Sequence, residues 1–259
     1  MIVKSYIRTP LTLALIASLT LAVPAIAQST RAAGQTYVYE LTTTSDVHPD
    51  LSKIPASMRG AVQANVAAGS TPTVYVLTAT TGEVAPDGSA KIHVQFTNSR
   101  LKNVPARFNQ FDGMLTPAGQ LVPNYDPNMP PPTGQMSDEQ MRNSTAGQFA
   151  LLFANFNDFA GGCGKRVRIK SGDAWRSGTS SQLSVAANYD FTVTAVAGSL
   201  ATVTMKGGFS STGGSNSVQG TGHYDMARRL VLDLHATQAF QNSAAGGSGT
   251  STVDYKLRQ

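Results

Sequence analysis

The side chains that could bind a metal or transfer protons include four histidines, and their spacing favours neither role. A zinc site draws two or three ligands from short, regular spacings, and these histidines lie far apart. His48 precedes a proline, while His93 and His235 alternate with apolar residues in segments that have the pattern of strands. His223 stands beside Asp225 in a predicted turn. We therefore expect all four histidines at the surface, with no metal and no cofactor.

Nucleophilic catalysis finds equally little support. A serine hydrolase of the α/β type places its serine in a Gly-x-Ser-x-Gly turn between a strand and a helix. Residues 208–210 and 214–216 each contain a glycine and a serine but do not match this pattern. The adjacent Asp138 and Glu139 fall in the first turn of a predicted helix, where negative charge stabilises the helix dipole. The sequence thus predicts no catalytic residue and leaves a hydrolase as the weakest alternative.

Cys163 is the single cysteine of the chain and lies in a glycine-rich segment, residues 161–165. A phosphate-binding loop would need glycine in place of Phe159 and serine or threonine in place of Arg166, so that function is excluded. One cysteine cannot form an internal disulfide. We expect Cys163 to be a small residue in a tight loop, while a reactive thiol or an intermolecular disulfide remains the alternative.

Aromatic residues are the better candidates for a binding site. They fall in two predicted strands near residues 37 and 189 and in one predicted helix near residue 150. Such residues either line an apolar cavity between sheet and helix or fill the core, and filling the core is the default. The candidate ligand-lining residues are Tyr37, Tyr39, Phe149, Phe153, Phe156, Tyr189 and Phe191.

The first 27 residues have the three parts of a secretory signal peptide. Lys4 and Arg8 precede an apolar run from Leu11 to Val23, and Ala25-Ile26-Ala27 gives the small-x-small cleavage pattern. The run is shorter than the roughly 20 residues that a spanning helix needs. We predict cleavage after Ala27, no transmembrane segment in the mature chain, and a location in the periplasm or outside the cell.

The mature chain, residues 28–259, is expected to form a single β-rich domain. Its formal charge is mild, because the whole chain carries +5 and two of those charges belong to the signal peptide. Lysine and arginine are scattered, and no basic patch is interleaved with aromatic residues. Nucleic acid is therefore not an expected partner.

A weak internal repeat organises this domain into units at about 34–125 and 172–259. Gly-x-x-aromatic opens each unit, and two later strand-turn-strand blocks recur in the same order. The first unit carries an insertion between Leu41 and Val74, where apolar residues at a spacing of four predict a helix that ends near Gly69. A linking loop and helix at about 126–165 joins the units, and Ser137 and Gln140 form a capping-box pattern at its start.

The remaining segments alternate between apolar and polar residues, as half-buried antiparallel strands do. Glycine- and serine-rich stretches at 207–217 and 243–251 are expected to be long hairpin loops. We count about ten strands of ordinary length and two helices. The predicted fold is mainly β with two helices (α+β), a curved antiparallel sheet or half-barrel with the helices across its concave face.

The signal peptide, the Gly-x-x-aromatic first strand, the repeated hairpins and the helices inside a curved sheet resemble the half-barrel, or β-clam, of lipoprotein carriers and related exported lipid-binding proteins. The segment from Arg166 to Trp175 resembles a stretch found in uncharacterised exported bacterial β proteins. The resemblance implies a non-catalytic protein that binds an apolar small molecule or lipid in the cell envelope. The alternative is a structural or protein-interaction module with an envelope protein as its partner.

Overall fold

A computed structural model describes residues 31–99, 108–130, 134–166, 168–179, 187–211, 214–242 and 247–258. The predicted signal peptide and its cleavage site after Ala27 lie outside the described residues.

The described strands form a single antiparallel sheet in the order β5-β4-β3-β2-β1-β11-β10-β9-β8-β7-β6. One half of the sheet comprises β1 (Thr36–His48), β2 (Thr73–Val84), β3 (Ala90–Asn98), β4 (Gln110–Leu115) and β5 (Leu121–Pro123). The other half comprises β6 (Ala174–Thr179), β7 (Ala187–Ala197), β8 (Leu200–Ser211), β9 (Gly214–Asp225), β10 (Leu230–Asn242) and β11 (Gly247–Leu257).

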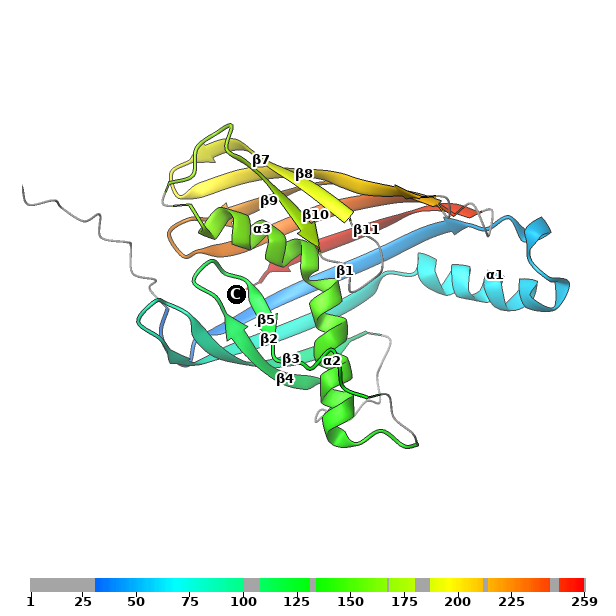
Figure 1. The fold of residues 1–259 in the computed structure, drawn as a ribbon, viewed down its shortest axis with the longest axis horizontal. Helices are drawn as coiled ribbons and strands as arrows, with labels where there is room; N and C mark the ends of the chain where they lie inside the picture. The colour runs from blue at the N-terminus through cyan, green and yellow to red at the C-terminus, as the bar shows by residue number, and fades with distance from the viewer. Residues whose placement is uncertain are drawn as a thin grey trace, which may run out of the picture.

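Each half is a meander of consecutive strands, and the pairing of β1 with β11 joins the two halves. This pairing runs from Tyr39 opposite Leu257 to His48 opposite Ser248. The sheet curves around one side and does not close, because β5 and β6 are its two edges. The predicted α+β half-barrel is confirmed, with eleven strands and three α-helices in the described residues (Figure 1).

The alternation read from the sequence decides which side chains face inward. In β3 the side chains of Ala90, Ile92, Val94 and Phe96 are buried, while the residues between them are exposed. Cross-strand partners share a face, so the same alternation passes from strand to strand across the sheet. The concave side of the half-barrel therefore holds the apolar core.

The predicted linking helix forms, but as two helices, α2 (Asp138–Leu152) and α3 (Ala154–Gly164). The capping box is present, since Ser137 Oγ accepts from the Gln140 amide and Gln140 Oε1 accepts from the Ser137 amide. The helical path breaks at Phe153, whose φ of −96° and ψ of 9° let the chain turn. The break is needed because α2 packs against β4 and β5, whereas α3 packs against β6 and β10.

The inserted helix lies elsewhere than the sequence indicates. Asp50 caps a short 3-10 helix, η1 (Leu51–Lys53), and α1 (Ala56–Ser70) follows. Helices α2 and α3 cross the concave side as predicted, whereas α1 lies at the far end of β1 and packs against that strand (Figure 1). Its apolar positions are too few and too small to anchor it inside the half-barrel, and none of its residues is buried.

The prediction of long loops in the glycine- and serine-rich stretches is wrong, because most of the described residues of these stretches belong to β8, β9 and β11. Glycine is needed there for space rather than for a turn. A Cβ atom at Gly207 would lie 2.3 Å from the carbonyl oxygen of Asn188, and one at Gly249 would lie 2.5 Å from that of Asp46. Residues 243–246 lie outside the described part of the chain.

Both halves contain the same local arrangement at the start of their first strands. The amide of Gly34 donates to the Thr81 carbonyl, and the amide of Gly172 donates to the Val193 carbonyl, each at 2.8 Å. Both glycines have positive φ, +81° and +92°. These matched contacts are what a duplicated unit requires, and the predicted repeat and domain boundaries stay predictions.

Candidate ligand-binding site

Four of the seven aromatic residues selected from the sequence form one chain of ring contacts on the concave side. Tyr39 of β1 meets Phe156 of α3 edge to face, with ring centroids 5.2 Å apart. Phe153 lies between the helices and contacts Phe149 at 4.4 Å and Phe156 at 5.4 Å. Because these rings come from a strand and two helices, they hold α2 and α3 against the sheet.

The other three predicted residues belong to the same core but have different neighbours. Phe191 stacks on Trp175 at 5.1 Å with an interplanar angle of 7°. Tyr37 and Tyr189 are each 9% exposed and lie at the margins of the core. The structure therefore gathers all seven residues on the concave side, where they pack against one another and against the core.

Sequence reasoning missed several aromatic members of this cluster. Tyr255 contacts both Phe153 and Phe156, at 5.2 and 5.7 Å. It lies in β11, whose glycine- and serine-rich start conceals the alternation that would have identified it. Phe159 follows Phe156 by three residues on the same helix and is fully buried, so the helical period could have predicted it.

Two buried tyrosine hydroxyls are polar groups within this apolar cluster. Tyr255 donates to the carbonyl of Leu152 at the end of α2. Tyr39 is 1% exposed, and its hydroxyl has no hydrogen-bond partner among the described residues. Burial raises the pKa of both hydroxyls well above the ordinary range, so both stay protonated.

Arg31 closes one end of the half-barrel. Its guanidinium is buried and donates to three backbone carbonyls, those of Gly88, Thr116 and Arg229. These carbonyls belong to the turns β2–β3, β4–β5 and β9–β10, so one side chain joins turns from both halves of the sheet. Burial lowers the pKa of Arg31, which nonetheless remains charged.

Direct contacts between the turns complete the same closed end. Tyr224 of β9 donates its hydroxyl to the carbonyl of Ala118 in the β4–β5 turn, at 2.9 Å. Gly119, with φ of +88°, approaches Arg229 so closely that a Cβ atom would lie 2.3 Å from its carbonyl oxygen. The two halves of the half-barrel therefore meet across the concave side at this end.

The opposite end has a different character. The strands β1, β10 and β11 continue past α2 toward α1 (Figure 1). Thr43 and Ser45 follow the inward-facing Leu41 by strand alternation, and they pair with Val253 and Ser251 of β11. These four side chains are half-buried rather than buried. The concave face thus changes here from large buried rings to small apolar and hydroxyl side chains.

The glycine-rich segment around Cys163 is helical, which corrects the predicted tight loop. Glycine is required because α3 approaches its neighbours closely, and a Cβ atom at Gly162 would lie 1.9 Å from Trp175 Nε1. Arg166 lies over the indole ring, with its Cζ 4.7 Å from the ring centroid. Cys163 is 1% exposed, and burial raises the pKa of its thiol to about 12, so it stays a protonated thiol.

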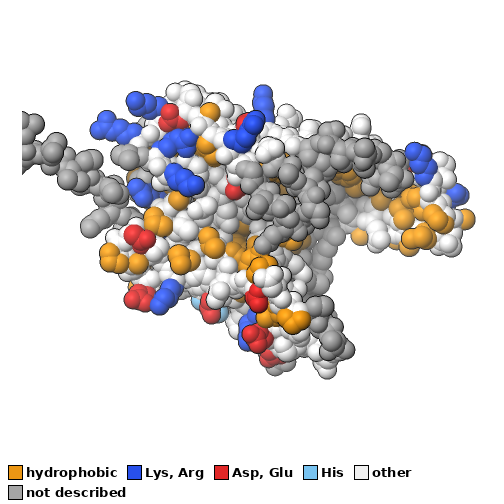
Figure 2. All heavy atoms as spheres, in the orientation of Figure 1, with side chains coloured by type: hydrophobic (Ala, Val, Ile, Leu, Met, Phe, Trp, Pro, Cys, Tyr) orange, Lys and Arg blue, Asp and Glu red, His pale blue; other side chains and the backbone are white. Residues whose placement is uncertain are grey.

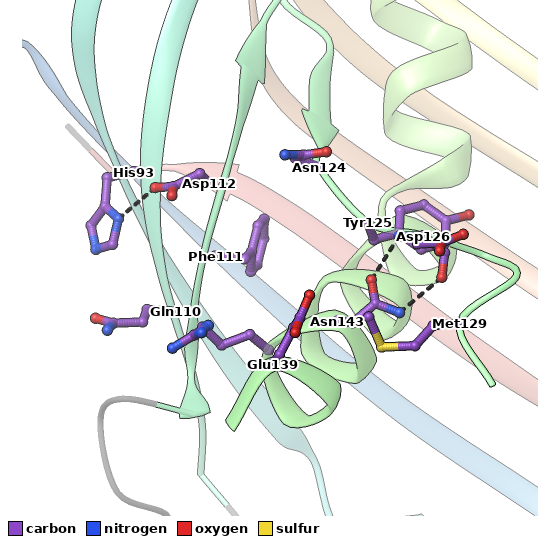
Figure 3. A pocket seen from close by; sticks show the side chains of 11 residues that line it. His93, Gln110, Phe111, Asp112, Asn124, Tyr125, Asp126, Met129, Glu139 and Asn143 are labelled. Atoms are coloured by element: carbon purple, nitrogen blue, oxygen red, sulfur yellow. Dashed lines mark hydrogen bonds and ion pairs between the residues drawn. The ribbon is translucent and has the colours of Figure 1, made fainter. Parts of the chain in front are cut away.

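A polar pocket of about 460 Å³ lies where α2 and the loop after β5 meet the outer side of β3 and β4 (Figure 3). His93 Nδ1 and Asp112 Oδ1 are 2.9 Å apart on one wall, and Asn143 holds the backbone of Asp126 on the other. The lining contains no serine, threonine or cysteine that could act as a nucleophile. The pocket therefore lacks the nucleophile of a serine or cysteine hydrolase.

The histidines lie on the surface, as predicted, and each pairs with an aspartate. Three pairs join directly opposite residues of neighbouring strands, with Nδ1–Oδ1 distances of 2.9, 2.8 and 2.5 Å. His48 instead pairs with Asp46 of its own strand. Among the described residues, no group of three or more potential ligands could hold a metal ion. The cross-strand pairs are His93–Asp112, His223–Asp233 and His235–Asp254.

Within the described part of the chain, no helix is both long and apolar enough to cross a membrane. No family model matches the sequence, and no curated protein matches it significantly. A solved structure titled "Lipid-protein interactions in lipovitellin" is similar in fold, with a TM-score of 0.50 and 7% sequence identity. The similarity covers 88% of this chain and 25% of that one. It shows that the two chains share a sheet architecture over about a quarter of the larger protein.

Proposed function

We propose that this protein binds an apolar ligand of the lipid class on the concave face of its half-barrel, in the cell envelope and without catalysis. The observation that carries the proposal is the change along the concave face, from a closed end filled by aromatic rings to a half-buried end lined by small side chains. An apolar chain resting on Thr43, Val253 and Ser251 would continue the core and exclude water from it.

The chemistry of this surface suits a ligand with an apolar body and few polar groups. Tyr75 and Leu152 border the surface, and both are partly buried hydrophobic side chains packed against the core. Ser45 and Ser251 share a hydrogen bond of 3.2 Å, so their hydroxyls are satisfied and add little polarity to the floor. The shared architecture with a structure studied for its lipid–protein interactions agrees with this choice of ligand.

The predicted signal peptide and the β-clam resemblance supply the proposed location. An exported carrier would meet lipid in the periplasm or at the outer face of a membrane. The hydrolase alternative has the least support, because the polar pocket around His93 and Asp112 contains no serine, threonine or cysteine.

The proposal is tested by native mass spectrometry and lipid extraction on protein purified from the periplasm, followed by titration with a fluorescent fatty acid. Thr43→Trp fills the concave surface and is expected to weaken probe binding at least about tenfold, since it occupies the site of an apolar chain. Thr42→Trp is the matched control, because the neighbouring side chain faces the convex side. No co-purifying lipid together with equal probe binding by both variants would refute the proposal and favour a structural or interaction module.

A further inference from the structure

Helix α1 is the least buried α-helix of the described chain, and its largest apolar side chain is exposed. None of its fifteen residues is buried, and Met58 is 55% exposed. Figure 2 shows hydrophobic side chains gathered over this end of the molecule, with basic side chains beside them. Val62 and Val66 are half-buried on the side of α1 that packs against β1, whereas Met58 and Ala61 are exposed, so part of the apolar surface of the helix has no cover among the described residues.

Little within the chain stabilises this helix. Its N-cap residue, Pro55, makes no side-chain hydrogen bond, and the helix has no acidic residue in its first turn and no basic residue in its last. An isolated helix of about 15 residues is marginally stable in water even with a favourable sequence. The main packing of α1 is against β1, beside the part of that strand that extends beyond β2.

The charge of the same segment has one sign. Residues 51–72 contain Lys53 and Arg59 and no aspartate or glutamate. Both basic side chains are exposed. The nearest preceding carboxylate, Asp50, accepts hydrogen bonds from the amide and hydroxyl of Ser52. An exposed helix with apolar side chains and only positive charge is complementary to a surface whose negatively charged outer layer covers an apolar interior.

We propose that α1 docks on the surface of an anionic lipid bilayer, with Met58 and its apolar neighbours in the headgroup boundary and with Lys53 and Arg59 on the lipid phosphates. Surface helices that expose both apolar and basic side chains can lie in the plane of the interface, where they bind through apolar burial together with attraction to anionic lipid. The docking rests on the proposed function, because a carrier of apolar ligands must exchange them at a membrane. It would place the half-buried end of the concave face next to the bilayer.

The test is co-sedimentation of the mature chain with vesicles of equal parts phosphatidylglycerol and phosphatidylcholine, beside vesicles of phosphatidylcholine alone. Binding to the anionic vesicles is expected, and it should weaken with added salt. Lys53→Gln and Arg59→Gln should each weaken vesicle binding about fivefold, because each basic residue near an anionic surface strengthens binding by about that factor. Met58→Asp should weaken binding at least about tenfold.

Met114→Asp is the matched control, because Met114 is 48% exposed on β4, far from α1, and its loss should leave vesicle binding unchanged. Since α1 has no buried residue, every α1 variant should keep the urea midpoint of the sheet. Equal binding by Met58→Asp and wild type, or no vesicle binding at all, would overturn the inference. Concentration-dependent self-association that Met58→Asp abolishes would assign α1 to a second copy of the chain instead.

The outcomes separate this inference from the proposed function. Vesicle docking without bound lipid or probe binding would refute the carrier and keep α1 as a membrane contact. Probe binding that Thr43→Trp abolishes, without vesicle docking, would keep the carrier and reject the docking helix.

Discussion

Replacing Arg31 with methionine should destabilise the half-barrel more than any exposed substitution. The guanidinium donates to the carbonyls of Gly88 and Arg229 at 2.9 and 3.0 Å, and also to that of Thr116. Hydrogen bonds from a charged donor contribute about 1.5–3 kcal/mol each to stability. Burying the guanidinium offsets part of that gain, as the lowered pKa of Arg31 indicates. We expect Arg31→Met to lower the free energy of unfolding by about 3–5 kcal/mol, because three backbone carbonyls lose their donor and each buried polar group left unsatisfied costs about 1–3 kcal/mol.

The assay is equilibrium unfolding in urea, followed by circular dichroism and by the fluorescence of Trp175, the single tryptophan. The midpoint should fall at an unchanged slope, because the surface exposed on unfolding stays the same. The urea midpoint of Arg31→Lys should lie between those of the wild type and Arg31→Met, since an ammonium keeps the charge but loses the planar fork that reaches three carbonyls.

The control is Arg176→Met, because that guanidinium is exposed and pairs with Asp190 across the sheet surface. Its midpoint should remain close to that of the wild type. A loss below about 1 kcal/mol for Arg31→Met would refute the view that this side chain fastens the closed end, since one charged hydrogen bond alone contributes more.

Three further predictions follow from buried or strained groups. Gly162→Val should lower the urea midpoint and shift the Trp175 emission, because a Cβ atom there overlaps the indole; unchanged emission would contradict the packing. Cys163 should react with a thiol reagent only after unfolding, since its pKa of about 12 and its burial keep it protonated and covered; rapid native labelling would contradict this. Asp225→Asn should lose stability at neutral pH, because burial opposes the charge but bonds from Arg228 and nearby amides outweigh it and lower the pKa. That loss should disappear as the pH falls below the unfolded value of 3.8 and through the lower folded pKa, and unfolding at several pH values measures it.

Much of the sheet could be predicted because its strands obey a period of two. The alternation from Ala90 to Phe96 appears unchanged as burial in β3. The start of α2 could be predicted because the capping box is a local signal that needs no tertiary contact. The seven aromatic candidates all reached the concave side for the same reason, since strand and helix periods identify a face before they identify its neighbours.

The sequence could not show the features that depend on close approach between distant segments. The helical period of the sequence runs unbroken through Phe153 and therefore gives no sign of the break between α2 and α3. The break is explained only by the fold, in which α2 packs against β4 and β5 and α3 packs against β6 and β10. Glycine at 162 has the appearance of a loop residue until Trp175 is seen against it. The half-buried end of the concave face was likewise hidden, because Thr43 and Ser251 lie far apart in sequence and have no chemical signature.

The pairing of β1 with β11 has a consequence for the order in which the protein can fold. The first and last described strands are neighbours at the centre of the sheet, with Thr43 opposite Val253, so the contact that joins the halves spans nearly the whole described chain. Contacts between such distant segments form slowly, because a long loop must close before they contribute. Each meander can form from its own hairpins, but the half-barrel is complete only when β11 pairs with β1. Until then β1 and β10 present open edges, and the growing chain depends on whatever keeps those edges apart from other strands.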